Sequence, residues 1–171
     1  MRRVTALATV VGLFAAAVPA ALAGPENVSF PADYKTTFKI IDTRDFHLGG
    51  NTVAVIYANQ IAIDSAKKGG ALASGSVFLM ETYRAKVDNG APVLDDKGRM
   101  IKDSINGINM MERRTGWGKD YPAEWRNDEW EFATFTADGQ RRTGNLQPCF
   151  ECHKPVGDAG FDYAYAVGIM R

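Results

Sequence analysis

The sequence predicts a single domain of the α+β class, in which an antiparallel β-sheet is flanked by a few helices. Three segments, residues 52–58, 76–86 and 130–136, are rich in β-branched and aromatic residues and are typical of strands. Turns rich in glycine, asparagine and aspartate separate these segments, as expected for strands that reverse direction. At 171 residues, the chain is long enough for one hydrophobic core.

The part of the chain before the first strand is predicted to form a helix and then a loop. Residues 32–41 carry apolar side chains at helical spacing, and Pro31 suits the start of a helix. Residues 42–51 are mostly polar and include the pair Gly49-Gly50, so we expect a loop there.

The first strand leads directly into a predicted helix. Asn59 can cap the N-terminus of a helix that runs to Lys68, and the pair Gly69-Gly70 suits its end. Residues 76–86 then form the second strand, in which apolar side chains fall on both faces.

The second half of the sequence predicts further strands around an irregular segment. Residues 100–111 read as a third strand with an irregular end at Gly107, and residues 130–136 as a fourth. Between them, residues 113–127 combine aromatic side chains with glycine and proline and should be irregular. Residues 161–167 are predicted to form a last short strand.

The first 23 residues predict a secretory signal peptide. Arg2 and Arg3 precede an apolar run over residues 4–18, and Ala21-Leu22-Ala23 follows as a small-x-small cleavage pattern. A membrane-spanning anchor is the alternative, but the run is shorter than the roughly 20 residues that such a helix needs. We expect cleavage after Ala23, export to the periplasm and a mature domain of residues 24–171.

The charge of the mature chain is nearly balanced. Without Arg2 and Arg3 it would keep 18 basic and 20 acidic residues, a formal charge of −2. Charges of both signs are interspersed, so the sequence predicts no nucleic-acid partner and no attraction to a membrane surface.

Near its C-terminus the chain reads Cys149-Phe150-Glu151-Cys152-His153, the C-x-x-C-H pattern of c-type haem attachment. Each thiol can add to one vinyl group of a haem, and the histidine then lies under the iron as an axial ligand. The pattern predicts one covalent haem c per chain, attached to Cys149 and Cys152, with His153 as the metal ligand.

Two other interpretations of the cysteine pair fit the sequence less well. A redox-active C-x-x-C pair is expected within a βαβ unit, but only 18 residues follow His153 and they contain no such unit. A zinc site needs a third and a fourth ligand at suitable spacing. The chain has two cysteines and two histidines, and His47 is the only spare histidine.

The position of the motif excludes two familiar haem folds. A small electron-transfer cytochrome c begins with the motif and builds its fold, with a distal methionine, downstream of it; here only 18 residues follow. A four-helix cytochrome c′ carries its motif near the C-terminus, but it needs four long amphipathic helices where this chain predicts strands.

Four blocks of the sequence resemble the cytochrome P-460 family, which includes the cytochromes c′-beta. They are residues 53–59, residues 75–83 (GSVFLMETY), residues 111–135, and residues 149–155 together with the tail Phe161-Asp162-Tyr163. The third block combined with the C-x-x-C-H motif is the most specific part of the resemblance.

The resemblance implies an antiparallel sheet with flanking helices, a dimer, and one high-spin haem whose distal side is open to small molecules. The P-460 branch oxidises hydroxylamine and links a lysine to the haem edge, whereas the c′-beta branch lacks that link, keeps an apolar distal pocket and binds nitric oxide. Aligned on Gly75 and Glu81, the lysine position falls at Met80. No lysine occurs between Lys68 and Lys86, which argues against the crosslink.

Several residues are candidates for the haem surroundings. Phe78 and Met80 share a face if their strand is regular, so both are expected to line the haem pocket, although each could instead be ordinary core. Met80 could also act as a sixth iron ligand, and His47 is a weaker candidate for that role. Carboxylates that could carry protons beside the iron, or lie on the surface, are Glu124, Glu131 and Glu151.

Together these features predict a periplasmic mono-haem c-type cytochrome with an open distal iron site that binds small nitrogen ligands such as nitric oxide. One alternative is an enzyme that oxidises hydroxylamine or nitric oxide and passes electrons to a soluble redox partner. The other is a six-coordinate electron-transfer cytochrome. We also expect a homodimer with no membrane anchor once the signal peptide is cleaved.

Overall fold

The computed structural model describes residues 25–47, 50–119 and 121–171. The expected signal peptide, residues 1–23, lies outside the described residues. None of the helices in the described part has both the length and the apolar character needed to cross a membrane.

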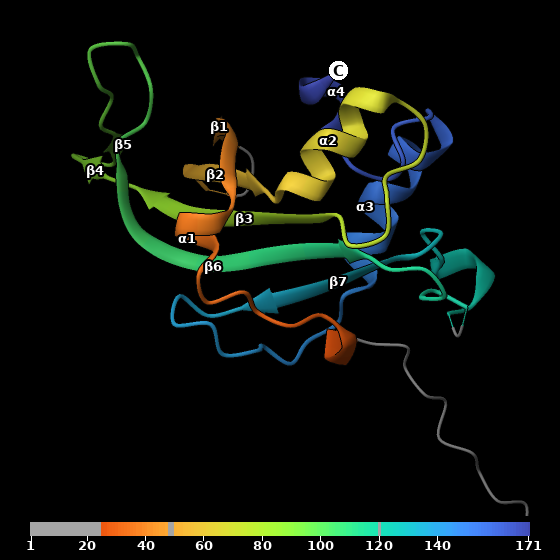
Figure 1. Ribbon diagram of the computed structural model, residues 1–171. Helices are drawn as coiled ribbons and strands as arrows, with labels where there is room; N and C mark the ends of the chain where they lie inside the picture. Colours follow the sequence, from red (N-terminus) through yellow and green to blue (C-terminus); the bar gives the residue numbers. More distant parts are fainter. Residues whose placement is uncertain (1–24, 48–49, 120) are drawn as a thin grey trace, which may run out of the picture.

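A five-stranded antiparallel sheet forms the body of the protein, and its strands lie in the order β1-β2-β3-β6-β7 (Figure 1). A small hairpin, β4 and β5, forms a second sheet. The structure therefore confirms the predicted α+β class. The strands are β1 (Lys39–Phe46), β2 (Thr52–Ala58), β3 (Val77–Ala85), β4 (Val87–Asp88), β5 (Ala91–Pro92), β6 (Lys102–Arg113) and β7 (Trp130–Phe135).

Short helices lie on both sides of the sheet. Helices α2 (Gln60–Lys68), α3 (Gln147–Asp158) and α4 (Val167–Met170) contribute to one core cluster and lie together in Figure 1. The helix α1 (Tyr34–Thr37) contributes to the other cluster. Two short 3₁₀ helices, η1 (Pro25–Asn27) and η2 (Ala123–Trp125), complete the described elements.

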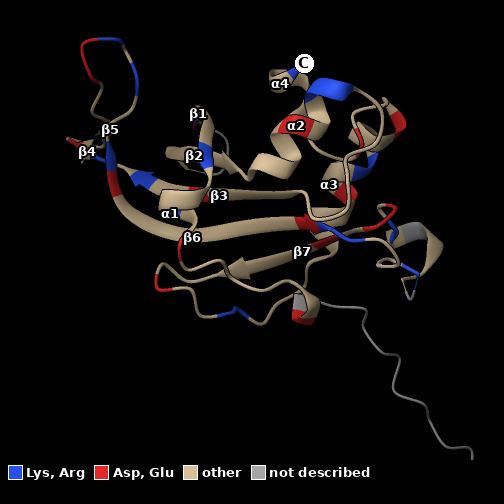
Figure 2. Ribbon diagram, in the orientation of Figure 1, with Lys and Arg blue, Asp and Glu red and all other residues tan. Residues whose placement is uncertain are grey.

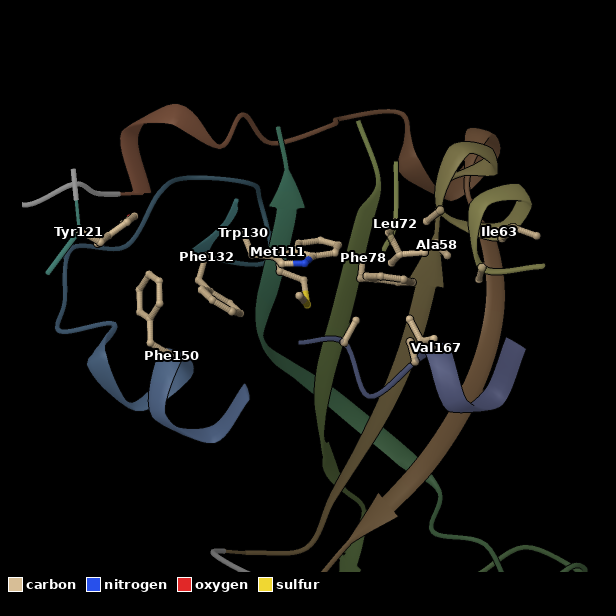
Figure 3. Close-up of a cluster of buried hydrophobic side chains, with 14 residues drawn as sticks. Ala58, Ile63, Leu72, Phe78, Met111, Tyr121, Trp130, Phe132, Phe150 and Val167 are labelled. Carbon is tan, nitrogen blue, oxygen red and sulfur yellow. The ribbon is translucent and has the colours of Figure 1, made fainter. Parts of the chain in front are cut away.

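The sheet separates two hydrophobic clusters because side chains along a strand point alternately to its two faces. We call the surface that carries Phe78, Met111 and Phe132 the α3 face, because their cluster includes Phe150 of α3. Figure 3 shows these side chains pointing from β3, β6 and β7 toward the helices. The opposite surface, the Glu81 face, carries Glu81 and the apolar side chains of a second cluster that includes Leu79.

The structure corrects the two predictions for the N-terminal part. The helix expected over residues 32–41 ends at Thr37, and the chain from Lys39 onward belongs to β1. The loop expected over residues 42–51 is wrong for residues 42–46, which pair with β2. β1 is an edge strand whose side chains are mostly exposed, so the sequence carries no alternating apolar pattern that could have revealed it.

The elements around α2 are confirmed. The Asn59 side chain accepts a hydrogen bond of 2.9 Å from the backbone N–H of Ala62, as an N-cap should. The helix ends at Gly69, whose φ of 78° suits glycine. The strands predicted over residues 52–58, 76–86 and 130–136 all form, to within two residues at each end.

Two predictions in the second half need correction. The irregularity at Gly107 lies inside β6, where the pairing with β3 shifts register, and not at the end of the strand. The strand expected over residues 161–167 does not form, because these residues make turns that lead into α4.

The Glu81 face holds a buried carboxylate surrounded by tyrosines. The Glu81 side chain is 1% exposed and accepts hydrogen bonds from the hydroxyl groups of Tyr34, Tyr57 and Tyr83. The Lys35 ammonium lies 3.5 Å from the same carboxylate. A buried carboxylate is tolerated only when it is satisfied in this way.

This network shifts the pKa values of its members in opposite directions. Burial opposes ionisation of Glu81, but the tyrosine hydroxyls and Lys35 outweigh burial and hold the pKa of Glu81 below its usual value. Burial and the nearby carboxylate raise the pKa of Tyr83 to about 12 and also raise the pKa values of Tyr34 and Tyr57. The network stabilises the fold at pH values between the pKa of Glu81 and ~10. Its contribution is lost as pH falls through the depressed pKa of Glu81, and also as pH rises above ~10, where unfolded tyrosine ionises.

We predict that Glu81→Gln lowers the free energy of unfolding by about 3 kcal/mol, because an amide cannot accept three hydroxyl donors as a carboxylate does. Urea denaturation followed by circular dichroism measures this change, with the exposed Asp96→Asn as the control. The variant should also lose the decrease in the free energy of unfolding that the wild type shows as pH falls through the pKa of Glu81. A Glu81→Gln protein as stable as the control would show that the network contributes little.

Candidate functional site

Helix α3 holds the three residues of the C-x-x-C-H motif on one side. Residues three and four positions apart on a helix are neighbours, so Cys149, Cys152 and His153 share a face. The proline Pro148 lies in the first turn, where the missing N–H does no harm, and so favours the start of the helix just before the motif.

The imidazole of His153 is held by a backbone carbonyl and two aromatic rings. Its Nδ1 lies 2.6 Å from the carbonyl oxygen of Tyr163. The rings of Phe132 and Tyr165 lie 4.9 and 5.3 Å from the imidazole, centroid to centroid. Because a carbonyl can only accept a hydrogen bond, Nδ1 must carry the proton, and Nε2 keeps the lone pair that binds a metal.

The protonation of His153 also suits a metal ligand. Burial lowers the pKa of its imidazole, and the hydrogen bond to the Tyr163 carbonyl only partly opposes this effect. The ring is therefore neutral near pH 7, which is the form that coordinates a metal ion.

The two thiols differ in their surroundings. Cys149 is half-buried and packs against the cluster of the α3 face, whereas Cys152 is exposed. Burial, with a smaller contribution from Cys152, raises the pKa of the Cys149 thiol. The hydroxyl of Tyr165 donates a hydrogen bond of 2.9 Å to the carbonyl of Cys152 and lies 3.7 Å from its Sγ. Both thiols are free, and one of them is directly accessible.

The sheet residues expected near the haem lie on the α3 face. Phe78 belongs to the same cluster as Phe150 and stacks on Trp130, with ring centroids 5.9 Å apart. Met80 lies two residues further along β3 on the same face and is half-buried, outside that cluster. Pairing between strands puts Met80 in one row with three neighbours, namely Ile56, Asn109 and Thr134.

The row around Met80 is partly polar, so the sheet surface that is expected to line the haem pocket is not purely apolar. The Asn109 side chain is exposed, and its amide lies 3.4 Å from the hydroxyl of Thr82. The guanidinium of Arg142 lies over Gly107 on the same face, 3.1–3.2 Å from the position that a Cβ there would take. Arg142 could not be predicted from the sequence, because its guanidinium lies over the sheet only where Gly107 of β6 has no side chain.

The other candidates lie away from His153. His47 follows β1 at the end of the sheet where Phe46 pairs with Thr52. Phe132, which contacts His153, lies at the other end of the sheet, in the cross-strand row that includes Ala58. Glu131 lies next to Phe132 along β7 and so points to the Glu81 face.

Two further carboxylates were candidates for proton transfer. Glu151 is exposed and accepts a hydrogen bond of 2.6 Å from Gln147. Glu124 belongs to η2, and its side chain lies outside the described part of the structure. No described contact links either residue to His153.

Comparison with protein families identifies the chain's relatives. Residues 31–165, which make up most of the sequence, match the family described as Cytochrome P460. The chain belongs to the cytochrome P460 family. This finding confirms the resemblance noted from the sequence and identifies a haem protein. A search among curated proteins found no match.

The site of this cytochrome P460 family member fits a haem. His153 offers a neutral imidazole with a free Nε2, and two free thiols stand beside it on α3. The sequence motif predicts these three residues, but it does not indicate Tyr163 and Tyr165, which orient the imidazole. The aromatic pattern of residues 161–167, which predicts a strand, is the sign of them that the sequence carries.

We predict that His153→Ala changes the absorption spectrum of the haem-loaded protein strongly, because it removes the only imidazole beside the two thiols. His47→Ala is the matched control and should leave the spectrum unchanged, because His47 lies at the far end of the sheet. A large change in the His47 variant would instead support coordination by both histidines.

Proposed function

We propose that this cytochrome P460 family member carries one haem c, attached through Cys149 and Cys152, and binds a small nitrogen ligand such as nitric oxide. The haem would supply an iron with one coordination position open to a small molecule. The observation that carries the proposal is the orientation of His153. Its Nδ1–H donates a hydrogen bond to the Tyr163 carbonyl, so Nε2 is the nitrogen that remains to bind the iron.

The α3 face favours binding of a neutral ligand over oxidation of hydroxylamine. That oxidation releases protons as well as electrons and so needs a proton acceptor near the ligand. The row of Met80 contains Ile56, Asn109 and Thr134, none of which is a base. Glu81, the carboxylate nearest to Met80 in sequence, points to the opposite face. Met80 also has no amine with which to form the crosslink of the hydroxylamine-oxidising branch.

The coordination of the iron separates ligand binding from electron transfer. A thioether sulfur from Met80 would complete a six-coordinate iron and leave no position for nitric oxide. We propose a five-coordinate iron, with Met80 and Phe78 as parts of the pocket wall. Phe78 is fixed by its stack on Trp130, whereas Met80 is half-buried and unbranched, so it can move aside for a ligand.

We also propose a cellular setting for this activity. Residues 1–23 would direct export to the periplasm, and the mature chain would form a homodimer and exchange electrons with a soluble redox partner. The edge strand β1 exposes Ile40 and Phe46, which suit a contact between copies. An apolar hollow of about 380 Å³, lined in part by Phe161 and Tyr165, lies beside the motif helix and suits a partner.

We predict that the reduced, haem-loaded protein is high-spin and binds nitric oxide, and that Met80→Leu changes its affinity by less than about tenfold, or ~1.4 kcal/mol. Leucine keeps the volume of the wall but cannot bind iron. Met110→Leu is the matched control, because Met110 is buried in the cluster of the opposite face. Absorption spectra and a nitric oxide titration measure both quantities.

Two outcomes would contradict the proposal. A low-spin spectrum that becomes high-spin in Met80→Leu, but not in Met110→Leu, would identify a six-coordinate electron carrier. Multiple turnovers of hydroxylamine in a steady-state assay would identify the oxidising enzyme.

A further inference from the structure

The residues that follow α3 adopt an unusual backbone conformation. Asp162 and Tyr163 have φ values of 49° and 59°, in the left-handed region that residues other than glycine rarely occupy. Two such residues in succession cost conformational energy, and they persist only when the surrounding structure holds them. The carbonyl that binds His153 belongs to the second of these residues.

The side chain of Asp162 is anchored from two directions. One carboxylate oxygen accepts a hydrogen bond of 2.7 Å from the backbone N–H of Leu72, which lies between α2 and β3. The other lies 3.3 Å from a guanidinium nitrogen of Arg113, at the end of β6. The side chains of Arg113 and Asp162 are 9% and 8% exposed, so the pair is shielded from water.

Arg113 is itself held in place by other carboxylates. Its guanidinium also pairs with Asp128 at 2.6 Å and with Glu129 at 3.2 Å. Figure 2 shows basic and acidic stretches meeting where β6 ends. Asp162 is thus tied through Arg113 to the sheet and to the loop before β7.

Tyr163 is fixed on its other side by α3. Its ring lies against Gly157, where a Cβ would come within 2.3–2.5 Å of the ring atoms. Gly157 lies one helical turn after His153 on the same helix. The ring of Tyr163 and its carbonyl therefore both contact α3. The contacts of Asp162 with Leu72 and Arg113 fix the backbone just before Tyr163.

We propose that the Arg113–Asp162 pair is a positioning device for the iron ligand. It fixes the Tyr163 carbonyl, and through this carbonyl it sets the hydrogen bond to Nδ1 of His153. This inference rests on the proposed role of His153 as the axial ligand. A hydrogen bond accepted from Nδ1–H makes the imidazole a stronger donor to a metal, so the device would strengthen the iron–histidine bond and favour ferric iron.

The decisive variant is Asp162→Asn in the haem-loaded protein. Asparagine keeps the shape of the side chain and tolerates positive φ, but it removes the charge that faces Arg113. We expect the iron–histidine stretching band of the ferrous protein, measured by resonance Raman, to shift to lower frequency. The midpoint potential should rise. Glu112→Gln, the control, removes a buried carboxylate charge that pairs with Arg114 instead of Arg113, and should change neither quantity.

A second variant keeps the test decisive if Asp162→Asn fails to fold. Gly157→Ala displaces the Tyr163 ring while favouring the helix, because alanine has the higher helix propensity. It should shift both quantities in the same directions. If the folded variants keep the iron–histidine stretching band and the midpoint potential of the wild type, the proposal is overturned.

The nitric oxide titration of the wild type separates this inference from the proposed function. If the wild type binds nitric oxide but the variants keep its stretching band, only the positioning role fails. If the wild type does not bind nitric oxide but the variants shift the band, only the proposed ligand fails. Should the chain carry no haem, ¹⁵N NMR of the full chain still reports the His153 tautomer. Loss of the Nδ1–H form in Asp162→Asn is expected, and its retention would count against the positioning role.

Discussion

The hydrogen bond between His153 Nδ1 and the carbonyl of Tyr163 is the interaction on which the rest of the proposed site depends. It fixes the tautomer of the imidazole and so decides which nitrogen can bind a metal. It also joins α3 to the turn that follows. The rings of Phe132 and Tyr165 pack against the imidazole and limit its rotation. A free imidazole on a helix surface would have none of these constraints, and binding iron would then cost the entropy of ordering it.

The register of the sheet decides what faces the motif helix. Along β3, Phe78 and Met80 point to the α3 face, whereas Leu79 and Glu81 point away from it. A slip of one residue would exchange these sets and turn Glu81 toward α3. The bonds from Tyr34 and Tyr57 to Glu81 oppose such a slip, because a carboxylate without its donors would be costly to bury. The network on one face thus helps to keep the Glu81 carboxylate away from the other face.

The sequence was informative where a pattern is local and strong. The C-x-x-C-H motif, the capped helix after Asn59 and the apolar strands could be found without the structure, because residue type and spacing determine them. The edge strand β1 could not, since exposed side chains leave no apolar alternation. The turn at Asp162 and Tyr163 could not either, because distant partners, Leu72 and Arg113, hold its backbone.

Mass spectrometry of haem-bound peptides is the sharpest test of haem attachment, with protein that was matured by c-type cytochrome machinery and then denatured. We expect one haem on the α3 peptide, held by two thioether bonds to Cys149 and Cys152, with no covalent bond to any other residue. A peptide without haem would contradict the attachment itself. A third bond from the haem to a lysine would contradict the assignment to ligand binding and point to the hydroxylamine-oxidising branch.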